Sequence, residues 1–409
     1  MNLTRFDREQ ILHKVSDLVE KKHFNPGLNG VDWRAVVENG AARVLESETP
    51  EQFEREMHEL VSQLKTSHTG FFHQSARAIP ARLSINATFK KCEVSGAERW
   101  MVLDIHEGGP AHAVGLEPGD VLLSMAGEDV IPPTQPVFKM GEATDIVVLK
   151  RDGRQTSVKV SVPAPKLKNH PVSHPQPVLF RKLDGGMGLL RVTMFPGIVG
   201  IDFARDIDRA FEQLDCDRLI VDMRGNTGGG IGGLRLMSYL TPLKIPVGYS
   251  LSRVRAEKGY KKESLPRFGR IPRFKVALIW LAVRYGRVGG SIAVITEGLG
   301  PQKFHGRVVM LVNQQSASAA EIVAGFAAEN KLAKIVGTRT AGRLMSGSAF
   351  KVGHGYLLGL PVAAFFTWQG TLLEGKGITP DVEVDLTYDS LKAGRDPQVE
   401  KAIEVVRAL

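Results

Sequence analysis

Two serines lie at a junction where a hydroxyl group could act as a nucleophile. The run Ser316-Ala-Ser318-Ala-Ala-Glu321 follows an apolar segment, 308–312, that predicts a buried strand, and it precedes a predicted helix over 319–329. A serine at the start of a helix lies near unpaired backbone N–H groups and the positive end of the helix dipole, which favour a developing anion. Ser318-x-x-Glu321 is also the pattern of a capping box, and spacing alone favours this structural role.

A glycine-rich stretch offers groups that such a nucleophile would need. Residues 224–233 follow the nearly continuous apolar segment 218–222, a predicted strand. Glycine N–H groups aimed into a cleft can stabilise an oxyanion. The stretch also contains Gly228-x-Gly230-x-x-Gly233, a dinucleotide-binding pattern, but no acidic residue closes a strand about 20 residues further on. A turn where two backbones approach closely is favoured over a dinucleotide site.

The elements that must position these residues alternate between strands and helices. Strands are predicted at 187–192, 218–222, 308–312 and 333–336, and helices at 201–214 and 319–329. This alternation predicts an α/β core with a mostly parallel sheet covered by helices. Functional loops are expected at the carboxyl ends of the strands.

The first part of the chain has a different organisation. Residues 1 to about 65 read as helices, with a start signal at Thr49-Pro50 and an amphipathic stripe after it, and 66–70 reads as a loop. Short β-type segments follow at 100–105 and 120–124, with a hairpin over 145–162. We therefore expect a helical segment over 1–79, a small β domain over 80–165, the α/β core over 166–395 and a C-terminal helix over 396–409. A Pro-rich and Lys-rich linker is expected over 163–177.

Composition excludes several classes of protein. A length of 409 residues, with 43% hydrophobic and 24% charged content, indicates a multidomain globular chain. Most of the net charge of +9 comes from one segment, 253–275, with nine Lys and Arg against two Glu, so a basic loop is favoured over nucleic-acid binding.

Other features bear on location and metals. The longest apolar run, 276–283, is too short to span a membrane, and the start lacks a signal-peptide pattern, so we expect a cytoplasmic protein. Two distant cysteines indicate neither a disulfide framework nor a cysteine zinc site. His170 and His174 lie four apart, but flanking prolines argue against a metal site, and no cofactor is expected.

The β-type segment resembles a known domain. The sequence Ala113-Val-Gly-Leu-Glu-Pro-Gly-Asp-Val-Leu-Leu-Ser124, followed by Gly127, is similar to the signature of bacterial-type PDZ domains. The resemblance implies a groove that binds an extended peptide as an added strand. The usual carboxylate-binding loop is not obvious near 85–89, so recognition of a free C-terminus does not follow.

Four further motifs occur in a fixed order along the chain: Asp222-Met-Arg-Gly-Asn-Thr-Gly-Gly229, Val312-Asn-Gln-Gln-Ser-Ala-Ser-Ala-Ala-Glu-Ile322, Val336-Gly-Thr-Arg-Thr-Ala-Gly342 and Gly375-Lys-Gly-Ile-Thr-Pro-Asp-Val382. They resemble, in this order, the motifs of the tail-specific, or C-terminal processing, protease superfamily, in which a PDZ domain commonly precedes a crotonase-like α/β core. The resemblance assigns the nucleophile to Ser318 rather than Ser316. It implies an oxyanion hole from the N–H of Gly228 or Gly229 with that of Ala319.

One departure from the family pattern concerns the general base. The Ser-Lys branch has a Thr-x-Gly-Lys motif, with a Gln four residues after the Lys, where this chain has Thr340-Ala-Gly-Arg343 and then Gly347. Arginine does not lose its proton near neutral pH, so Arg343 cannot be the base. Lys351 and Lys376 stay open as alternatives, although neither lies in the lysine motif.

A second branch of the superfamily offers another base. Ser67-His68 resembles the Ser-His pair of the tricorn core protease and retinoid-binding-protein-like branch, and Glu374 matches the acidic member of that branch. The resemblance implies a tetrad of Ser318, His68, Ser67 and Glu374, in which the imidazole takes the serine proton. Asp222, Arg224 and Asn226 would brace the glycine loop, and Arg343 would have a positioning or packing role.

These inferences predict a serine endopeptidase that cleaves unstructured polypeptides or C-terminal tails, either as a monomer or as a homo-oligomer. The alternative is a non-catalytic protein of the same fold that holds a peptide or an apolar ligand.

Overall fold

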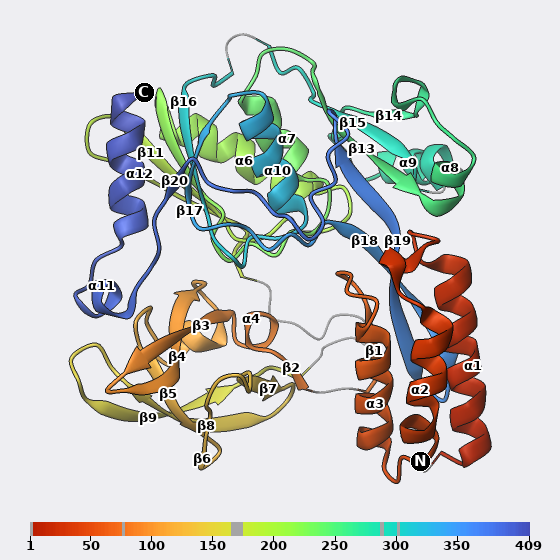
Figure 1. Cartoon of the computed structure of the whole chain (residues 1–409). Coiled ribbons are helices and arrows are strands. Elements are labelled where there is room, and N and C mark those ends of the chain that lie inside the picture. Colours follow the sequence, from red (N-terminus) through yellow and green to blue (C-terminus); the bar gives the residue numbers. More distant parts are fainter. Residues whose placement is uncertain (1–2, 76–77, 165–174, 287–289, 301–302) are drawn as a thin grey trace. The chain divides into compact units, whose positions relative to one another are not determined.

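A computed structural model describes residues 3–75, 78–164, 175–286, 290–300 and 303–409. The chain divides into two compact units that interleave along the sequence (Figure 1). Unit 1 comprises residues 1–76, 244–297 and 342–377, and unit 2 comprises 77–243, 298–341 and 378–409. The domain boundaries at 79, 165 and 395 stay predictions, and most of the expected linker and both of its histidines lie outside the described residues.

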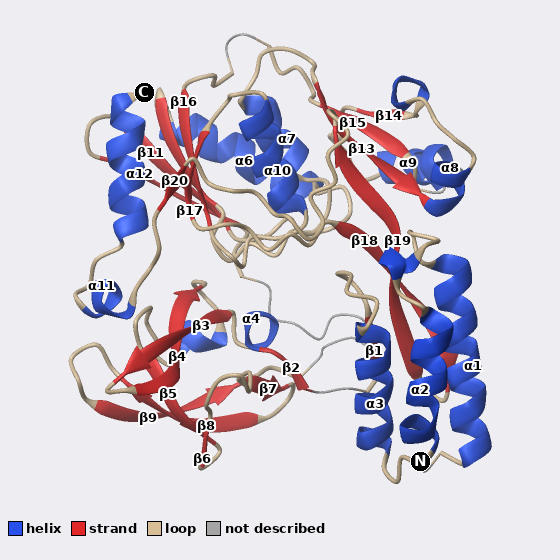
Figure 2. Cartoon of the chain, in the orientation of Figure 1, coloured by secondary structure: helices blue, strands red, loops and turns tan. Residues whose placement is uncertain are grey.

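Unit 1 combines three N-terminal helices with a mainly antiparallel sheet (Figure 2). The helices are α1 (Arg5–Lys22), α2 (Trp33–Leu45) and α3 (Pro50–Ser62). The predicted start of α3 is confirmed, because the Thr49 hydroxyl accepts a hydrogen bond from the Gln52 N–H at 3.1 Å. The apolar stripe of α3 is buried against the sheet with residues of α1, β1 and β19. This packing fixes the loop over 66–69 that carries the Ser-His pair.

The sheet of unit 1 has the order β1-β19-β13-β15-β14, and β18 pairs with β19. The strands are β1 (Gly70–His73), β13 (Pro246–Ser252), β14 (Arg267–Phe268), β15 (Ile292–Ile295), β18 (Met345–Gly353) and β19 (Tyr356–Thr367). Two short helices, α8 (Arg253–Glu257) and α9 (Ala277–Gly286), lie in the middle segment of this unit. This sheet was absent from the sequence prediction, because its strands come from three distant segments whose pairing no local pattern reports.

Unit 2 contains a small β sheet and an α/β sheet. The small sheet has the order β3-β4-β5-β8-β9, with β6 beside β5. Its strands are β3 (Ala87–Val94), β4 (Ala97–Ile105), β5 (Val121–Met125), β6 (Glu128–Asp129), β8 (Ala143–Leu149) and β9 (Gln155–Ser161). Helices α4 (Ala81–Ser84) and α5 (Pro110–Ala113) lie along the same segment, and β2 (Ala78–Pro80) pairs with β7 (Val137–Lys139). The predicted hairpin is β8 with β9.

The α/β sheet has the order β10-β11-β12-β16-β17-β20, and only β10 runs antiparallel to its neighbour. Its strands are β10 (Val178–Leu183), β11 (Met187–Val192), β12 (Arg218–Asp222), β16 (Arg307–Val312), β17 (Lys334–Gly337) and β20 (Val382–Glu383). The predicted α/β class with a mostly parallel sheet is confirmed. Apolar runs such as 218–222 form these strands because both faces of a parallel sheet are covered.

Helices cover both faces of this sheet (Figure 1). α6 (Ile201–Leu214), α7 (Gly233–Tyr239) and α10 (Ala319–Glu329) lie on one side, and α12 (Pro397–Ala408) packs on the other, with α11 (Tyr388–Lys392) preceding it. The register pairs Asp222 of β12 with Leu311 of β16. The loops that follow these two parallel strands therefore leave the sheet at the same edge.

Candidate active site

The nucleophile candidate Ser318 lies at the turn between β16 and α10, with an unusual backbone conformation. Its φ of 56° and ψ of −120° lie outside the regions that a non-glycine residue normally adopts. The Ser318 N–H donates to Oε2 of Glu321 at 3.0 Å, and the Thr340 hydroxyl donates to Oε1 of the same carboxylate at 2.6 Å. Glu321 is fully buried, and the capping box expected from spacing is present. The capping contacts of Glu321 therefore help to hold the strained turn, and this turn places the half-buried Ser318 at the N-terminus of α10.

The other serine of the run, Ser316, has its hydroxyl committed to the interior. It is fully buried, donates from Oγ to the Met223 carbonyl at 2.8 Å and accepts from the Asn313 N–H at 3.0 Å. The contact with Met223 ties the segment after β16 to the loop after β12, and the contact with Asn313 closes the turn after β16 on itself. Ser316 thus has the surroundings of a structural residue.

The glycine-rich loop packs directly against the Ser318 turn. A Cβ atom on Gly228 would lie only 2.6 Å from Cβ of Ser318, so no larger residue fits there. The family resemblance predicts the N–H of either Gly228 or Gly229 in an oxyanion hole. The Gly228 N–H already donates a hydrogen bond to Oδ1 of Asn226 at 2.8 Å. Within the described part of the chain, the N–H groups of Gly229 and Ala319 donate no hydrogen bond. The N–H groups of Gly229 and Ala319 are therefore the candidate donors to an oxyanion.

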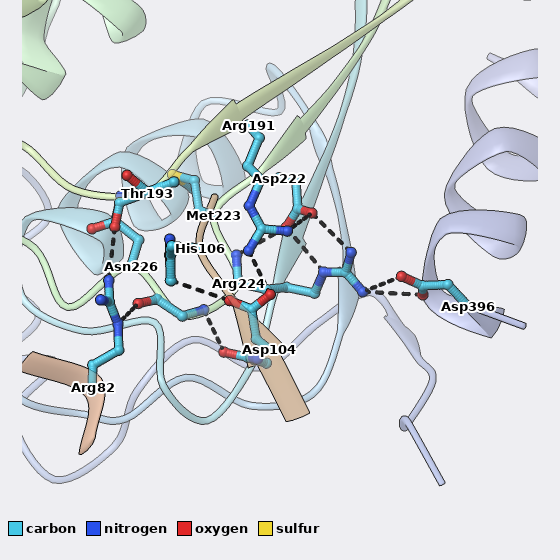
Figure 3. A network of polar contacts seen from close by, with 12 residues as sticks. Arg82, Asp104, His106, Arg191, Thr193, Asp222, Met223, Arg224, Asn226 and Asp396 are labelled. Atoms are coloured by element: carbon cyan, nitrogen blue, oxygen red, sulfur yellow. Dashed lines mark hydrogen bonds and ion pairs between the residues drawn. The ribbon is translucent and has the colours of Figure 1, made fainter. Parts of the chain in front are cut away.

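Three polar side chains hold the base of the glycine loop (Figure 3). Arg224 bridges two carboxylates, with Nη2 at 2.8 Å from Oδ2 of Asp222 and Nη1 at 2.8 Å from Oδ2 of Asp396. Burial alone would raise the pKa of Asp222, but Arg224 and Arg191 outweigh it and hold that pKa below its ordinary value. Asn226 donates from Nδ2 to the Val192 carbonyl at 3.0 Å. The contacts of Asp222, Arg224 and Asn226 are those of bracing residues.

Sequence reasoning missed a second set of side chains around this loop, which comes from the segment with the PDZ-like signature (Figure 3). Arg82 donates from Nε to the Gly225 carbonyl at 2.7 Å and from Nη2 to the Thr193 carbonyl at 3.1 Å. Burial lowers the pKa of Arg82 to about 10, which still leaves it charged at neutral pH. Asp104 pairs with Arg191 at 2.5 Å, and a Cβ on Gly225 would lie 2.7 Å from Oδ2 of Asp104. No local signal could have found these residues, because their partners lie about 90 to 140 positions away.

His106 completes this set and is fully buried. Its Nε2 lies 3.2 Å from Oδ2 of Asp104, and burial lowers its pKa, although Asp104 opposes the shift. A neutral imidazole therefore packs beneath the loop.

In unit 1, Glu374, Ser67 and His68 form a continuous hydrogen-bond chain. The Ser67 hydroxyl donates to Oε2 of Glu374 at 2.9 Å and lies 2.9 Å from Nδ1 of His68. The Ser67 N–H also donates to Oε1 of Glu374 at 2.8 Å. Because the single hydroxyl proton goes to a carboxylate that can only accept, Oγ of Ser67 must accept from Nδ1–H of His68. This assignment leaves the lone pair on Nε2, the nitrogen that a general base would use.

The surroundings of His68 tune its pKa in two directions. Desolvation lowers the pKa, the Glu374 carboxylate raises it and Arg343 lowers it, and the net direction is downward. His68 itself has a φ of 61°, again in the left-handed region. The imidazole is therefore neutral and able to accept a proton at neutral pH.

Gly347 occupies the position where the Ser-Lys branch has a glutamine, and the structure gives a physical reason for the glycine. A Cβ atom there would lie 2.8 Å from Cβ of His68, closer than side-chain atoms approach without displacement. A glutamine and this His68 conformation therefore exclude one another. Lys351 and Lys376 are both exposed, on β18 and in the turn after Glu374.

The described residues contain no group of three His, Cys, Asp or Glu side chains placed to hold a metal ion. None of the described helices has both the length and the apolarity that a bilayer crossing requires.

Comparisons with known proteins point to peptidases. The profile of peptidase family S41 matches residues 186–384. A putative tricorn protease homolog 2 of Streptomyces coelicolor is 23% identical over 99% of this chain, and carboxy-terminal processing protease CtpA of Bacillus subtilis is 24% identical over 68% of it. The chain covers 34% of the first relative and 52% of the second, which is less than two thirds of their length.

Solved structures share the fold. A photosystem II D1 C-terminal processing protease aligns over 98% of this chain and 97% of its own, with a TM-score of 0.58 at 17% identity. Mature CPAF aligns over the same shares, with a TM-score of 0.61 at 15% identity.

Proposed function

Since the chain is a relative of the tail-specific protease superfamily, which comprises serine-type peptidases, we propose that it hydrolyses peptide bonds as a serine endopeptidase through Ser318, His68, Ser67 and Glu374. The observation that carries this proposal is the Glu374–Ser67–His68 hydrogen-bond chain. It supplies a neutral, oriented base in a chain that has Arg343 in place of the lysine of the other branch. The cytoplasmic location and the homo-oligomer stay predictions.

In the proposed reaction, Oγ of Ser318 attacks the carbonyl carbon of the scissile peptide while Nε2 of His68 takes the hydroxyl proton. The carbonyl oxygen becomes an oxyanion, which the N–H groups of Gly229 and Ala319 stabilise. The intermediate collapses when the C–N bond breaks and the imidazolium gives its proton to the leaving amine. Water then hydrolyses the acyl-enzyme by the same route.

Ser67 and Glu374 act through the imidazole rather than on the substrate. The imidazolium that forms donates a hydrogen bond from Nδ1 to Oγ of Ser67, and the Ser67 hydroxyl donates to the Glu374 carboxylate. The negative charge of Glu374 thus strengthens both hydrogen bonds and stabilises the positive charge on the ring. Glu374 also accepts the backbone N–H groups of Leu344 and Met345, at 2.6 and 3.2 Å. These contacts fix the carboxylate and keep the His68 ring in the orientation that leaves Nε2 free to react.

The proposed substrate is an unstructured polypeptide, and the PDZ-like segment is proposed to bind it as an added strand. Near residues 85–89, where no usual carboxylate-binding loop is obvious from the sequence, the backbone groups of Ile85 are already occupied: its N–H donates to the Ala81 carbonyl, and its carbonyl accepts from the Ala111 N–H. This occupancy favours recognition of an internal extended segment over recognition of a free C-terminus.

A serine-reactive phosphonate probe tests the proposal against the non-catalytic alternative. Only an activated serine is labelled, so the unmodified chain should react and the Ser318→Ala variant should not. Cleavage of casein by the same two proteins should agree with the labelling. Absence of labelling and of cleavage in the folded, unmodified chain would favour a binding protein of the same fold.

A further inference from the structure

Helix α9 carries apolar side chains on its solvent-facing side. Val276, directly before α9, and Ile279, Trp280 and Val283 within it follow the i, i+3, i+4, i+7 spacing of one helix face, and they are 75%, 69%, 57% and 65% exposed. The helix is thus apolar on the side that faces solvent, where surface helices usually carry polar side chains. Phe274, 64% exposed, extends this apolar stripe at its N-terminal end. A contiguous exposed stripe of this kind is typical of a docking surface rather than of ordinary surface residues.

The apolar stripe lies beside the most basic part of the chain. Nine of the 53 Lys and Arg residues fall within 253–275, against two Glu, and Arg284 follows within α9. Some of these cations hold the segment itself: Arg253 pairs with Glu257 at 2.9 Å, and Lys262 donates to the Trp368 carbonyl at 2.7 Å. Arg270, Arg273 and Lys275, which lead into the stripe, are all exposed. The protease chemistry uses neither the charge nor the stripe.

A cavity of about 510 Å³ lies between α9 and the strands β14 and β15. Four cationic residues, Lys244, Arg267, Arg270 and Arg284, line it together with apolar side chains that include Phe268 and Trp280. Such a lining matches a molecule with an anionic head and an apolar body.

We propose that this surface of unit 1 docks on a bilayer containing anionic phospholipids. The stripe of α9 enters the boundary between headgroups and acyl chains, the flanking cations attract the anionic headgroups, and the cavity receives one of them. A helix of 10 residues is about 15 Å long, so it lies in the plane of the interface and does not span the membrane. Trp280, with its amphipathic ring in the stripe, is the residue type that anchors proteins at this depth.

Charge complementarity favours a membrane over a second copy of the chain. Two copies meeting through this surface would bring two sets of like charges together, which disfavours association. An anionic bilayer offers opposite charge around an apolar interior, and both parts of the surface then find a matching environment. The proposal does not depend on peptide hydrolysis.

The test is co-sedimentation of the full chain with vesicles of phosphatidylcholine alone and with vesicles that contain about one third phosphatidylglycerol. We expect binding to the anionic vesicles, with loss at an ionic strength of about 1 M, where the Debye length is ~3 Å. Trp280→Ala should lower the partition coefficient about tenfold, and Arg270→Ala about fivefold on anionic vesicles only. Phe6→Ala is the matched control, because Phe6 is 65% exposed on α1 of the same unit and should leave binding unchanged.

Several outcomes would overturn the proposal. The first is absence of binding to either vesicle by folded protein, and the second is equal binding to both vesicles regardless of salt. The third concerns the Ile279→Asp variant. If this variant changes the molecular mass measured by light scattering but not the binding to vesicles, the surface is occupied by a second copy of the chain. Ser318→Ala should bind vesicles like the unmodified chain, so failure of the protease proposal and failure of this one give different results.

Discussion

Replacing Glu374 by glutamine perturbs the proposed base without removing it. The Glu374 carboxylate accepts four hydrogen bonds, two from Ser67 and two from backbone N–H groups of β18 and the residue before it. Glutamine keeps the shape but loses the charge, and its NH₂ group cannot accept. A hydrogen bond to a charged group contributes about 1.5–3 kcal/mol, so kcat/KM should fall about 10- to 100-fold.

The same substitution should also move the pH profile. Glu374 raises the pKa of His68, so Glu374→Gln lowers that pKa further and shifts the acid limb of activity to lower pH. Arg343 lowers the pKa of His68, so Arg343→Ala should shift the acid limb to higher pH while much of the activity is retained. In the unmodified chain, the acid limb should lie below the ordinary histidine value of about 6.5.

The assay is kcat/KM for a fluorogenic peptide measured from about pH 5 to 8, because this quantity reports the pKa of the free enzyme. Thermal melting of each variant checks that Glu374→Gln still folds after losing backbone contacts. An unchanged rate and profile in folded Glu374→Gln would refute the role of the hydrogen-bond chain. If the acid limbs of Glu374→Gln and Arg343→Ala shifted in the same direction, the electrostatic reasoning would be refuted.

Further substitutions and one ligand comparison test the remaining parts of the site. Ser318→Ala should abolish casein cleavage and cost at most about 1 kcal/mol of stability, measured by denaturant unfolding, and retained cleavage would reject this nucleophile. In steady-state assays, His68→Ala should lower kcat by about 100- to 10,000-fold, while Lys351→Ala and Lys376→Ala should leave kcat unchanged. Unchanged kcat in His68→Ala with a large loss in either lysine variant would establish a Ser-Lys mechanism. Gly347→Gln should lower kcat about 100-fold, because the new Cβ would lie 2.8 Å from that of His68 and displace the ring; unaltered kinetics would contradict this packing. Amidation of a peptide C-terminus should leave its affinity unchanged in calorimetric titration, and weaker binding of the amide would indicate carboxylate recognition.

Local patterns in the sequence were sufficient for many of the individual elements. The helices over 201–214 and 319–329 and the strand over 218–222 have the predicted bounds. Apolar periodicity and chain-local caps determine these elements, and both can be read from neighbouring residues. The ordered motifs likewise led to the tail-specific protease superfamily, and the family comparisons confirm that relation.

Tertiary structure decided how distant residues act together. The contact between Ser67 and Glu374 joins residues 307 positions apart, and Arg82 reaches Gly225 across 143 positions. The same holds for the sheet of unit 1 and for the exclusion of a side chain at position 347 by His68. Only the folded chain shows that the Gly228 N–H donates to Oδ1 of Asn226. Sequence patterns report which residue types follow one another, whereas these contacts depend on distances that exist only once the chain has folded.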